Sequence, residues 1–152
     1  MTMDVPPGGT YGKRVPKGSL ASVGGRMLGS IIRLSGGRIG GEMMLLTTVG
    51  AKSGKRGTTP VRRIPDGDDR WLAVASANGS AHHPAWLHNM VAHPDQIWIE
   101  IGNDTIHVHP EIMRGDERAA AWDRIVAEAP QFGSYPSITD REMPVVLLTR
   151  TE

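Results

Sequence analysis

The sequence of 152 residues predicts a mainly β fold with flanking helices, built as an antiparallel barrel of six strands. Two observations favour this class. Short apolar and β-branched runs follow one another from residue 43 onward, and tight turns join several of them. Only two segments in that stretch have a helical pattern, so we expect helices at the side of the barrel rather than between all of its strands.

The first three strands are expected over 43–49, 58–64 and 71–76. The run from residue 43 to residue 49 is continuously apolar or β-branched, which is typical of a strand buried on both faces. Asp66 and Gly67 lie between the second and third runs, and an Asp-Gly pair in that position is a strong hairpin signal. The sequence therefore predicts a hairpin that joins 58–64 to 71–76.

The other three strands are expected over 97–101, 105–113 and 144–149. Gly102 and Asn103 separate the first two of these runs, which predicts a second hairpin. Apolar and polar side chains alternate from residue 105 to residue 109, as expected for a strand with one buried face. We find no internal repeat in the sequence, so these strands are expected to complete a single barrel.

Two helices are predicted within this β-rich stretch. One covers about 84–92 and the other about 116–129. The second carries apolar residues on one face and ends before Pro130, which cannot continue the hydrogen-bonding pattern. Both are expected to pack at the side of the barrel.

The N-terminal part has a different composition. Residues 1–18 are rich in Gly, Pro, Lys and Arg, so we expect a flexible arm there, followed by a single domain over 19–152. Ser19 can cap a short helix that runs to about Leu34, although glycines weaken it. Arginines near this helix leave two alternatives open, namely packing against the domain or peripheral contact with a membrane.

Charge is unevenly distributed along the chain. Residues 1–63 carry eleven Lys/Arg and two Asp/Glu, a net charge of +9, whereas residues 64–152 carry six and fourteen, a net charge of −8. This asymmetry indicates that the first part binds an anion. The alternative is that the positive side chains of the first part lie near the negative side chains of the second part on a solvated surface.

The composition also argues against several classes of protein. There is no cysteine, which excludes disulfides, thiolate metal sites and a cysteine nucleophile. No apolar run is long enough to span a bilayer and residues 1–11 lack the core of a signal peptide, so a cytoplasmic location is expected. The four tryptophans lie in predicted strands and helices rather than between basic residues, so no nucleic acid is expected as a partner.

A basic, glycine-rich loop joins the first two predicted strands over residues 50–60. Its glycines allow the backbone to approach a ligand closely. Lys52, Lys55 and Arg56, with hydroxyl groups nearby, supply the positive charge and the donors that bind a phosphate. The glycine spacing differs from that of a Walker A loop, and a strand follows instead of a helix. From the loop alone, an anion-binding site and an exposed basic hairpin both remain open.

A second cluster runs from the end of the third predicted strand, near Ser76, to the start of the helix near Pro84. Its small residues leave room for a flat ring against backbone amides, and the start of a helix attracts electron-rich atoms. Trp86 and Asn89 share one face of that helix. The histidines of this region lack the spacing of a zinc site and no Gly-x-Ser-x-Gly turn is present, so we expect neither a metal nor serine-hydrolase chemistry.

In this order and spacing, the two clusters resemble the F420 (deazaflavin)-dependent nitroreductase and quinone reductase family of actinobacteria. The resemblance covers roughly residues 33–152, and its matching stretches are 45–56 (LLTTVGAKSGKR), 74–76 (VAS), 83–89 (HPAWLHN), 93–94 (HP) and 139–145 (TDREMPV). It implies a split β-barrel similar to the FMN-binding flavin reductases, with coenzyme F420 as the cofactor. It also implies hydride transfer to a small substrate, which is an enone or other activated alkene, a quinone or a nitroaromatic compound.

The resemblance further implies roles for individual residues. The phosphate and acidic tail of the cofactor would be held by Lys52, Ser53, Gly54, Lys55 and Arg56, and the same wall would continue through Thr59, Pro60 and Arg62. The cofactor ring would be lined by Ala75, Ser76, Asn78 and Gly79. Tyr135 would be the catalytic proton donor, in a substrate pocket shared with Phe132 and Trp86. Phe132 and Tyr135 follow the second predicted helix and precede the last strand, so we expect them on a loop that reaches over the ring. Many family members have a tyrosine where this chain has Phe132, so a less polar substrate pocket is expected.

Two other functional classes remain open at this point. A protein of the same barrel fold that binds FMN or haem would also have a basic loop. A non-enzymatic protein would use the N-terminal charge to bind an anionic surface. The sequence leaves the physiological substrate and the oligomeric state open.

Overall fold

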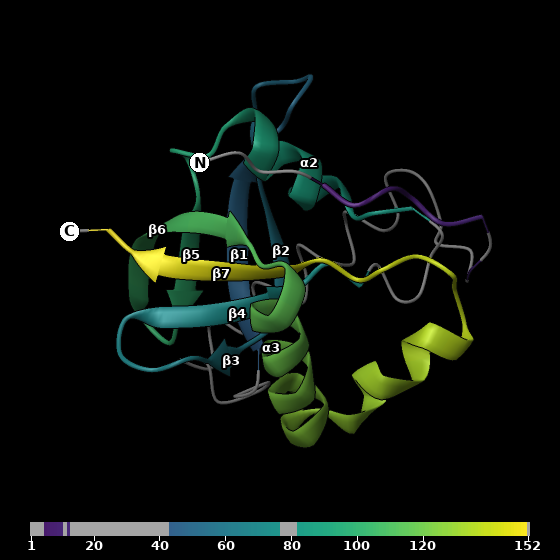
Figure 1. The fold of residues 1–152 in the computed structure, drawn as a ribbon. Helices are drawn as coiled ribbons and strands as arrows, with labels where there is room; N and C mark the ends of the chain where they lie inside the picture. Colours follow the sequence, from purple (N-terminus) through teal and green to yellow (C-terminus); the bar gives the residue numbers. More distant parts are fainter. Residues whose placement is uncertain (1–4, 11, 13–42, 77–81, 152) are drawn as a thin grey trace.

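The computed structural model describes residues 5–10, 12, 43–76 and 82–151 of the chain. Seven strands of this part form one antiparallel sheet in the order β2-β1-β5-β6-β7-β4-β3 (Figure 1). The strands are β1 (Met43–Val49), β2 (Arg56–Arg62), β3 (Ile64–Pro65), β4 (Arg70–Val74), β5 (Trp98–Ile101), β6 (Asp104–Ile112) and β7 (Val145–Arg150). The helices are α2 (Ala85–Ala92), α3 (Gly115–Glu128) and the 3₁₀ helix η2 (Pro130–Ser137).

The sheet curls on itself because its two edge strands are neighbours in the chain. β2 lies at one end of the strand order and β3 at the other, yet only Arg63 separates them. The sequence predicts one strand over 58–64, whereas the structure has two, since β2 pairs with β1 as far as Arg62 and β3 then pairs with β4. This change of partner turns the sheet into a half-barrel, and the predicted mainly β fold with flanking helices is confirmed.

Both predicted hairpins are present. Gly67 has a φ of 94° and Asp69 a φ of 59°, and these left-handed values let the chain reverse between β3 and β4. The Asp66 N–H donates to the Arg70 carbonyl over 3.0 Å and closes this turn. Gly102, with a φ of 61°, begins the turn between β5 and β6. The turn residues therefore act as the sequence predicts.

β6 connects the two halves of the sheet. Its first residues pair with β5, where Trp98 lies opposite His107, and its last residues pair with β7, where Ile112 lies opposite Val146. β7 in turn pairs with β4 on its other side. A single long strand thus carries the chain from one half of the barrel to the other.

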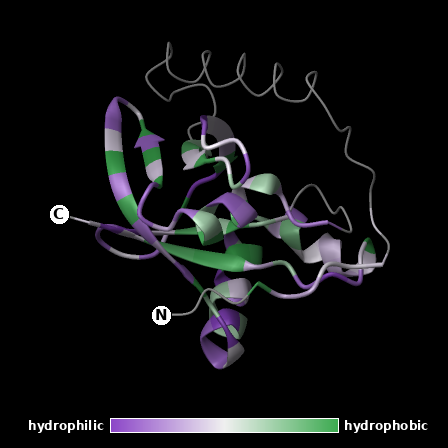
Figure 2. Cartoon of the chain, turned by 90° about the horizontal axis from the view of Figure 1, so that it is seen from above, coloured by the Kyte–Doolittle hydropathy of each residue, from purple (hydrophilic) through white to green (hydrophobic). Residues whose placement is uncertain are grey.

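Hydrophobic residues occupy two layers, one on each face of the sheet. Alternate residues of β4 divide between them, because Ala73 belongs to the cluster inside the barrel while Leu72 and Val74 belong to the cluster that faces α3. From α3, Ala121 and Ile125 complete this second cluster. In Figure 2 hydrophobic colour follows the strands, whereas α3, seen nearly end-on, is mostly hydrophilic. α3 therefore covers the sheet with one apolar face only.

The two predicted helices are confirmed, and each boundary agrees within one residue. The sequence pattern does not predict η2, since we expect a loop after α3 and find eight residues of 3₁₀ helix instead. The helix predicted over 19–34 lies outside the described residues. No helix within the described ranges is both long and apolar enough to cross a membrane.

The described N-terminal residues lie against the domain. Val5 packs against the cluster inside the barrel. Thr10 donates its N–H and its hydroxyl to the two carboxylate oxygens of Asp140, over 2.8 and 2.6 Å. Gly9 approaches so closely that a Cβ there would lie 2.8 Å from the Cβ of Arg141. The division into a flexible arm over 1–18 and a domain over 19–152 stays a prediction.

Candidate active site

A cavity of about 470 Å³ opens between β2, the end of β4, the start of α2 and η2. Seven residues that the sequence singles out line it: Thr59, Pro60, Arg62, Ser76, Trp86, Phe132 and Tyr135. They come from four separate segments of the chain, and the curling of the sheet brings them together. The volume lies within the range of about 300 to 1,000 Å³ found for small-molecule sites.

The two-residue period of a strand decides which residues at the end of β4 face this cavity. The side chains of Val74 and Ser76 line it, whereas the methyl group of Ala75 is buried in the cluster inside the barrel. The side chain of Ala75 therefore lies behind the cavity wall, and its contact with the cofactor ring stays a prediction. Asn78 and Gly79 lie outside the described residues.

The 3₁₀ helix explains why Phe132 and Tyr135 share the cavity. Such a helix has three residues per turn, so side chains three apart in sequence lie on the same side. Their ring centroids are 5.7 Å apart, with Phe132 buried and Tyr135 half-buried. We expect these aromatic residues on a loop, and the structure places them on one face of a helical turn instead. Their spacing is thereby fixed by backbone geometry.

The loop between β1 and β2 is closed by its own backbone hydrogen bonds. The Gly50 N–H donates to the Lys55 carbonyl and the Gly54 N–H to the Gly50 carbonyl, each over 2.9 Å. Gly54 has a φ of 67°, a left-handed value that favours glycine at this position. The Ser53 Oγ accepts the Lys55 N–H at 3.2 Å. The loop therefore has a defined shape, with residues 51–57 exposed to solvent.

Asn89 of α2 holds this loop against the domain. Its Oδ1 accepts the Ala51 N–H over 2.9 Å, and its Nδ2 donates to the Oγ1 of the buried Thr48 over 3.2 Å. A second cavity, of about 390 Å³, lies between the loop and α2 and is lined in part by Lys52 and Ser53. Ala85 and Trp86, consecutive residues in the first turn of α2, line the smaller and the larger cavity respectively.

The remaining predicted loop residues do not converge on either cavity. Gly54 and Lys55 are exposed at the tip of the loop. The guanidinium carbon of Arg56 lies 4.2 Å from the centre of the Trp98 ring, which is a cation–π contact. Trp98 in turn lies 5.5 Å from the ring of His107. The structure thus separates Arg56 from Lys52, although the two are only four residues apart.

Arg141 is a residue near the site that our sequence reasoning missed. It is 4% exposed, and its guanidinium donates to the carbonyls of Ala75 and Ser76 over 2.8 and 2.6 Å. It also lies 2.7 Å from the Nδ1 of His83. Burial lowers the pKa of Arg141 from its usual value. The sequence indicated Arg141 only as a member of the stretch 139–145, on which the resemblance depends.

His83 has a defined protonation state in this arrangement. Its Nδ1 accepts from Arg141, so its Nε2 carries the proton and donates to the Pro6 carbonyl over 2.6 Å. Burial lowers the pKa of His83 below 6.5, and the positive charge of Arg141 and the nearby His88 lower it further, while the bond to Pro6 raises it. His83 is therefore a neutral link between Arg141 and the N-terminal segment.

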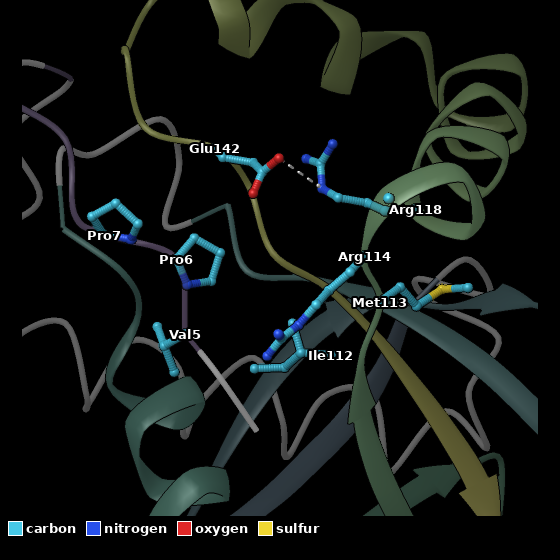
Figure 3. Close-up of a pocket in the computed structure, with 9 residues that line it drawn as sticks. Val5, Pro6, Pro7, Ile112, Met113, Arg114, Arg118 and Glu142 are labelled. Atoms are coloured by element: carbon cyan, nitrogen blue, oxygen red, sulfur yellow. Dashed lines mark ion pairs between the residues drawn. The ribbon is translucent and has the colours of Figure 1, made fainter. Parts of the chain in front are cut away.

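A third cavity, of about 270 Å³, lies at the start of α3 (Figure 3). Val5, Pro6 and Pro7 form one side of it, and Arg118 is directed toward Glu142 on another. The Nε of Arg118 lies 3.6 Å from a carboxylate oxygen of Glu142, and its Nη2 donates to the Met143 carbonyl over 2.6 Å. This cavity lies where the N-terminal segment packs on residues 141–143, apart from the residues predicted to bind a ligand.

The histidines form no arrangement that we can assign to a metal. Within the described parts of the chain, no group of three or more His, Asp or Glu side chains lies close enough together to hold an ion. His107 instead uses both ring nitrogens in hydrogen bonds, to the Thr151 hydroxyl at 2.6 Å and to the Asp95 carbonyl at 2.7 Å. In the described structure it links β6 to the segment before β5 and to the residue that follows β7.

The half-barrel and its open cavity define a split-barrel protein of the kind that binds a small molecule at the edge of its sheet. The model of the F420H(2)-dependent quinone reductase family matches residues 25–150, and the chain belongs to this family. The resemblance seen in the sequence, the oxidoreductase class and coenzyme F420 as the family's cofactor are thereby confirmed.

Individual relatives agree with this assignment. An F420H(2)-dependent quinone reductase of Mycobacterium tuberculosis is 37% identical over 135 residues, which cover 82% of this chain and 89% of the relative. The solved structure of the F420-H2 dependent reductase FDR-A is 31% identical, covers 70% of this chain and 93% of its own, and has a TM-score of 0.63. The heme storage protein HutZ of Vibrio cholerae, 13% identical with a TM-score of 0.51 over 73% of this chain and 82% of its own, shares the fold alone.

Proposed function

We propose that this protein reduces quinones with F420 as its cofactor, and that the cavity beside Tyr135 holds the reacting groups. The observation that carries this proposal is the cavity itself, because seven residues from four segments line it and it adjoins the basic loop. A cofactor with a flat ring and an anionic tail needs two different surroundings. The larger cavity offers aromatic walls for the ring, and the cation of Lys52 lies at the edge of the smaller cavity, whose own lining is mainly apolar.

The residues present fit such a ligand. Trp86 and Phe132 give the larger cavity flat apolar walls, and the edge strand β2 and the end of β4 line the rest of it. The smaller cavity has Lys52 and Ser53 at its edge, with the positive charge and the hydroxyl that bind a phosphate. We therefore assign the ring to the larger cavity and the anionic tail to the basic loop.

The chemistry divides between cofactor and protein. When bound in its reduced form, F420 supplies a hydride. Tyr135 brings a phenolic O–H to the cavity and would donate it to the substrate oxygen on which negative charge develops. Trp86 and Phe132 exclude water and hold a flat substrate parallel to their walls. Enones and nitroaromatic compounds share the flat conjugated system and the electron-accepting oxygen of a quinone, so we propose them as further substrates.

A binding titration tests the assignment of the cofactor. F420, FMN and FAD are titrated side by side into the full chain, followed by protein or cofactor fluorescence. F420 should bind at least about tenfold more tightly than FMN, a difference of about 1.4 kcal/mol in binding free energy. Equal or tighter binding of FMN would instead support an FMN-binding protein of the same fold.

A cytoplasmic location and peripheral contact with a membrane through the N-terminal segment are further proposals. Positive charge in residues 1–63 supports the second, since basic segments are attracted to anionic lipid. Sedimentation of the full chain with vesicles tests it. Binding to vesicles with anionic lipid, but not to neutral ones, is expected, and equal recovery in the supernatant with both would rule it out.

A further inference from the structure

The buried guanidinium of Arg141 supports the edge of the larger cavity from behind. It donates to the Ala75 carbonyl over 2.8 Å and to the Ser76 carbonyl over 2.6 Å. Ser76 lines the cavity, and Ala75 continues β4 because its N–H donates to the Pro144 carbonyl over 2.9 Å. Arg141 therefore binds the backbone of the cavity wall at the point where the strand ends.

The same guanidinium also holds a second part of the cavity border. It lies 2.7 Å from the Nδ1 of His83, and the next residue, Pro84, lines the cavity. Arg141 thus joins the chain just before and just after residues 77–81, at Ser76 and at His83. One side chain fixes the distance between these two points on the rim.

His83 extends this support to the N-terminal segment. Its Nε2 donates to the Pro6 carbonyl over 2.6 Å, and Gly9 packs directly against the backbone of Arg141. The hydroxyl of Thr10 is held by Asp140, the residue before Arg141. Three segments that are far apart in sequence therefore meet at one buried arginine.

Arginine is suited to this task and lysine is not. Its planar guanidinium has five N–H donors at fixed angles, so it can bind two carbonyls and a ring nitrogen at the same time. A lysine ammonium is a single point with three donors, and it cannot span the same three acceptors in this plane.

We propose that Arg141 is a positioning residue for the cavity, which it serves by holding Ser76 and His83 at a fixed separation. This inference rests on the proposed function as far as the ligand is concerned. The consequence is that Arg141 controls the affinity for F420 without contacting it. Tyr135 belongs to η2 and is held there by that helix.

The first test compares Arg141→Lys and Arg141→Met with Arg118→Met. Arg118 is a matched control, because it also donates to a backbone carbonyl in this segment, that of Met143, but it lines only other cavities. We expect Arg141→Lys to raise the Kd and the KM for F420 about tenfold while kcat stays within about threefold, and Arg118→Met to leave all three near the parent values. Equal changes in both arginine variants would overturn the proposal. If Arg141→Met does not fold, the lysine variant alone decides.

A second pair of variants separates the two bonds of His83. Asn at this position places its amide near Nδ1 and can still accept from Arg141, whereas Gln places its amide near Nε2 and can still donate to Pro6. We expect His83→Asn to bind F420 nearly as the parent does and His83→Gln to bind it severalfold more weakly. The reverse order would mean that the N-terminal contact, and not Arg141, supports the rim.

Hydrogen exchange on the protein without ligand makes the test independent of F420. The amides of Ala75 and Ser76 should exchange at least about tenfold faster in Arg141→Lys than in the parent, with Arg118→Met unchanged. If the parent fails to bind F420, the proposed function is wrong, and exchange still decides the role of Arg141. Parental exchange at both amides in Arg141→Lys would overturn the positioning role.

Discussion

Tyr135 is the residue on which the proposed chemistry depends most directly. It lines the larger cavity and lies 5.7 Å, centroid to centroid, from Phe132 on the same helical turn. Tyr135→Phe keeps the ring and removes the hydroxyl alone. We expect kcat/KM for a quinone or an enone to fall about tenfold to a hundredfold, the loss of one hydrogen bond that strengthens as charge develops. Steady-state kinetics at saturating F420 measure this loss.

Ser137→Ala is the control for this variant, since it removes a hydroxyl from the same 3₁₀ helix outside the cavity, where Ser137 donates to the Ser134 carbonyl. It should leave kcat/KM unchanged. The Kd for F420 should be the same in both variants as in the parent. Parental rates with every acceptor in Tyr135→Phe would show that Tyr135 is structural and that protonation comes from water.

His83 makes the stability of the protein depend on pH in a definite direction. Burial and the charges of Arg141 and His88 lower its pKa in the folded state below 6.5, so the unfolded chain binds the proton more readily. Its contribution to the free energy of unfolding is therefore complete above about pH 6.5 and is lost as the pH falls through the folded-state pKa. The His83→Gln variant lacks this titration, so the difference in Tm between parent and variant should shrink from about pH 7.5 to about pH 5.5. A Tm difference between parent and variant that grows as the pH falls would contradict the predicted direction.

At the scale of elements, α2 is the support on which the basic loop depends. Asn89 accepts the Ala51 N–H and donates to the buried Thr48 hydroxyl, so Asn89→Ala leaves both groups without these bonds. We expect a loss of about 1 to 3 kcal/mol in unfolding free energy and weaker binding of F420. Chemical denaturation and titration measure the two effects. Val91→Ala, at an exposed position of the same helix, should change neither the unfolding free energy nor the Kd for F420. A parental Kd in Asn89→Ala would mean that the loop does not bind the cofactor.

Local patterns predicted those elements whose cause is local. The Asp66-Gly67 hairpin and β1 follow from turn chemistry and from an apolar run, and both are present where the sequence places them. The division of 58–64 into β2 and β3 was not predictable, because it results from a change of strand partner. Likewise η2 carries no apolar period strong enough to mark it as helical.

The same distinction applies to the candidate site. The sequence predicted Thr59, Pro60, Arg62 and Tyr135 as ligand-binding residues, and the fold brings them to one cavity. Strand period, and not motif membership, decides that the side chains of Val74 and Ser76 line the cavity while that of Ala75 does not. Arg141 was missed because its contacts are made to backbone carbonyls 65 and 66 residues away, which no local pattern encodes.

On the scale of the whole molecule, closure of the sheet concentrates positive charge beside the cavity. Five cations of the described chain lie within twelve residues around β2: Lys52, Lys55, Arg56, Arg62 and Arg63. Arg62 lines the larger cavity and Lys52 the smaller one, whereas Lys55 is exposed and Arg56 lies on the Trp98 ring. The described part of the positive charge of residues 1–63 thus includes Lys52, next to the proposed site for an anionic tail.

The binding of F420 should therefore weaken as salt is added. The screening length falls from about 10 Å at 0.1 M to about 3 Å at 1 M, so attraction between exposed charges is largely removed over this range. We expect the Kd for F420 to rise about tenfold between these concentrations of NaCl. Lys52→Ala, at the edge of the smaller cavity, should flatten this dependence, whereas Lys55→Ala, at the exposed tip of the same loop, should flatten it less. Isothermal titration of the parent, Lys52→Ala and Lys55→Ala at the same temperature measures how the Kd of each protein for F420 changes with salt. Identical slopes for the parent and Lys52→Ala would mean that the loop is a solvated basic hairpin, and that the affinity for F420 comes from the aromatic cavity alone.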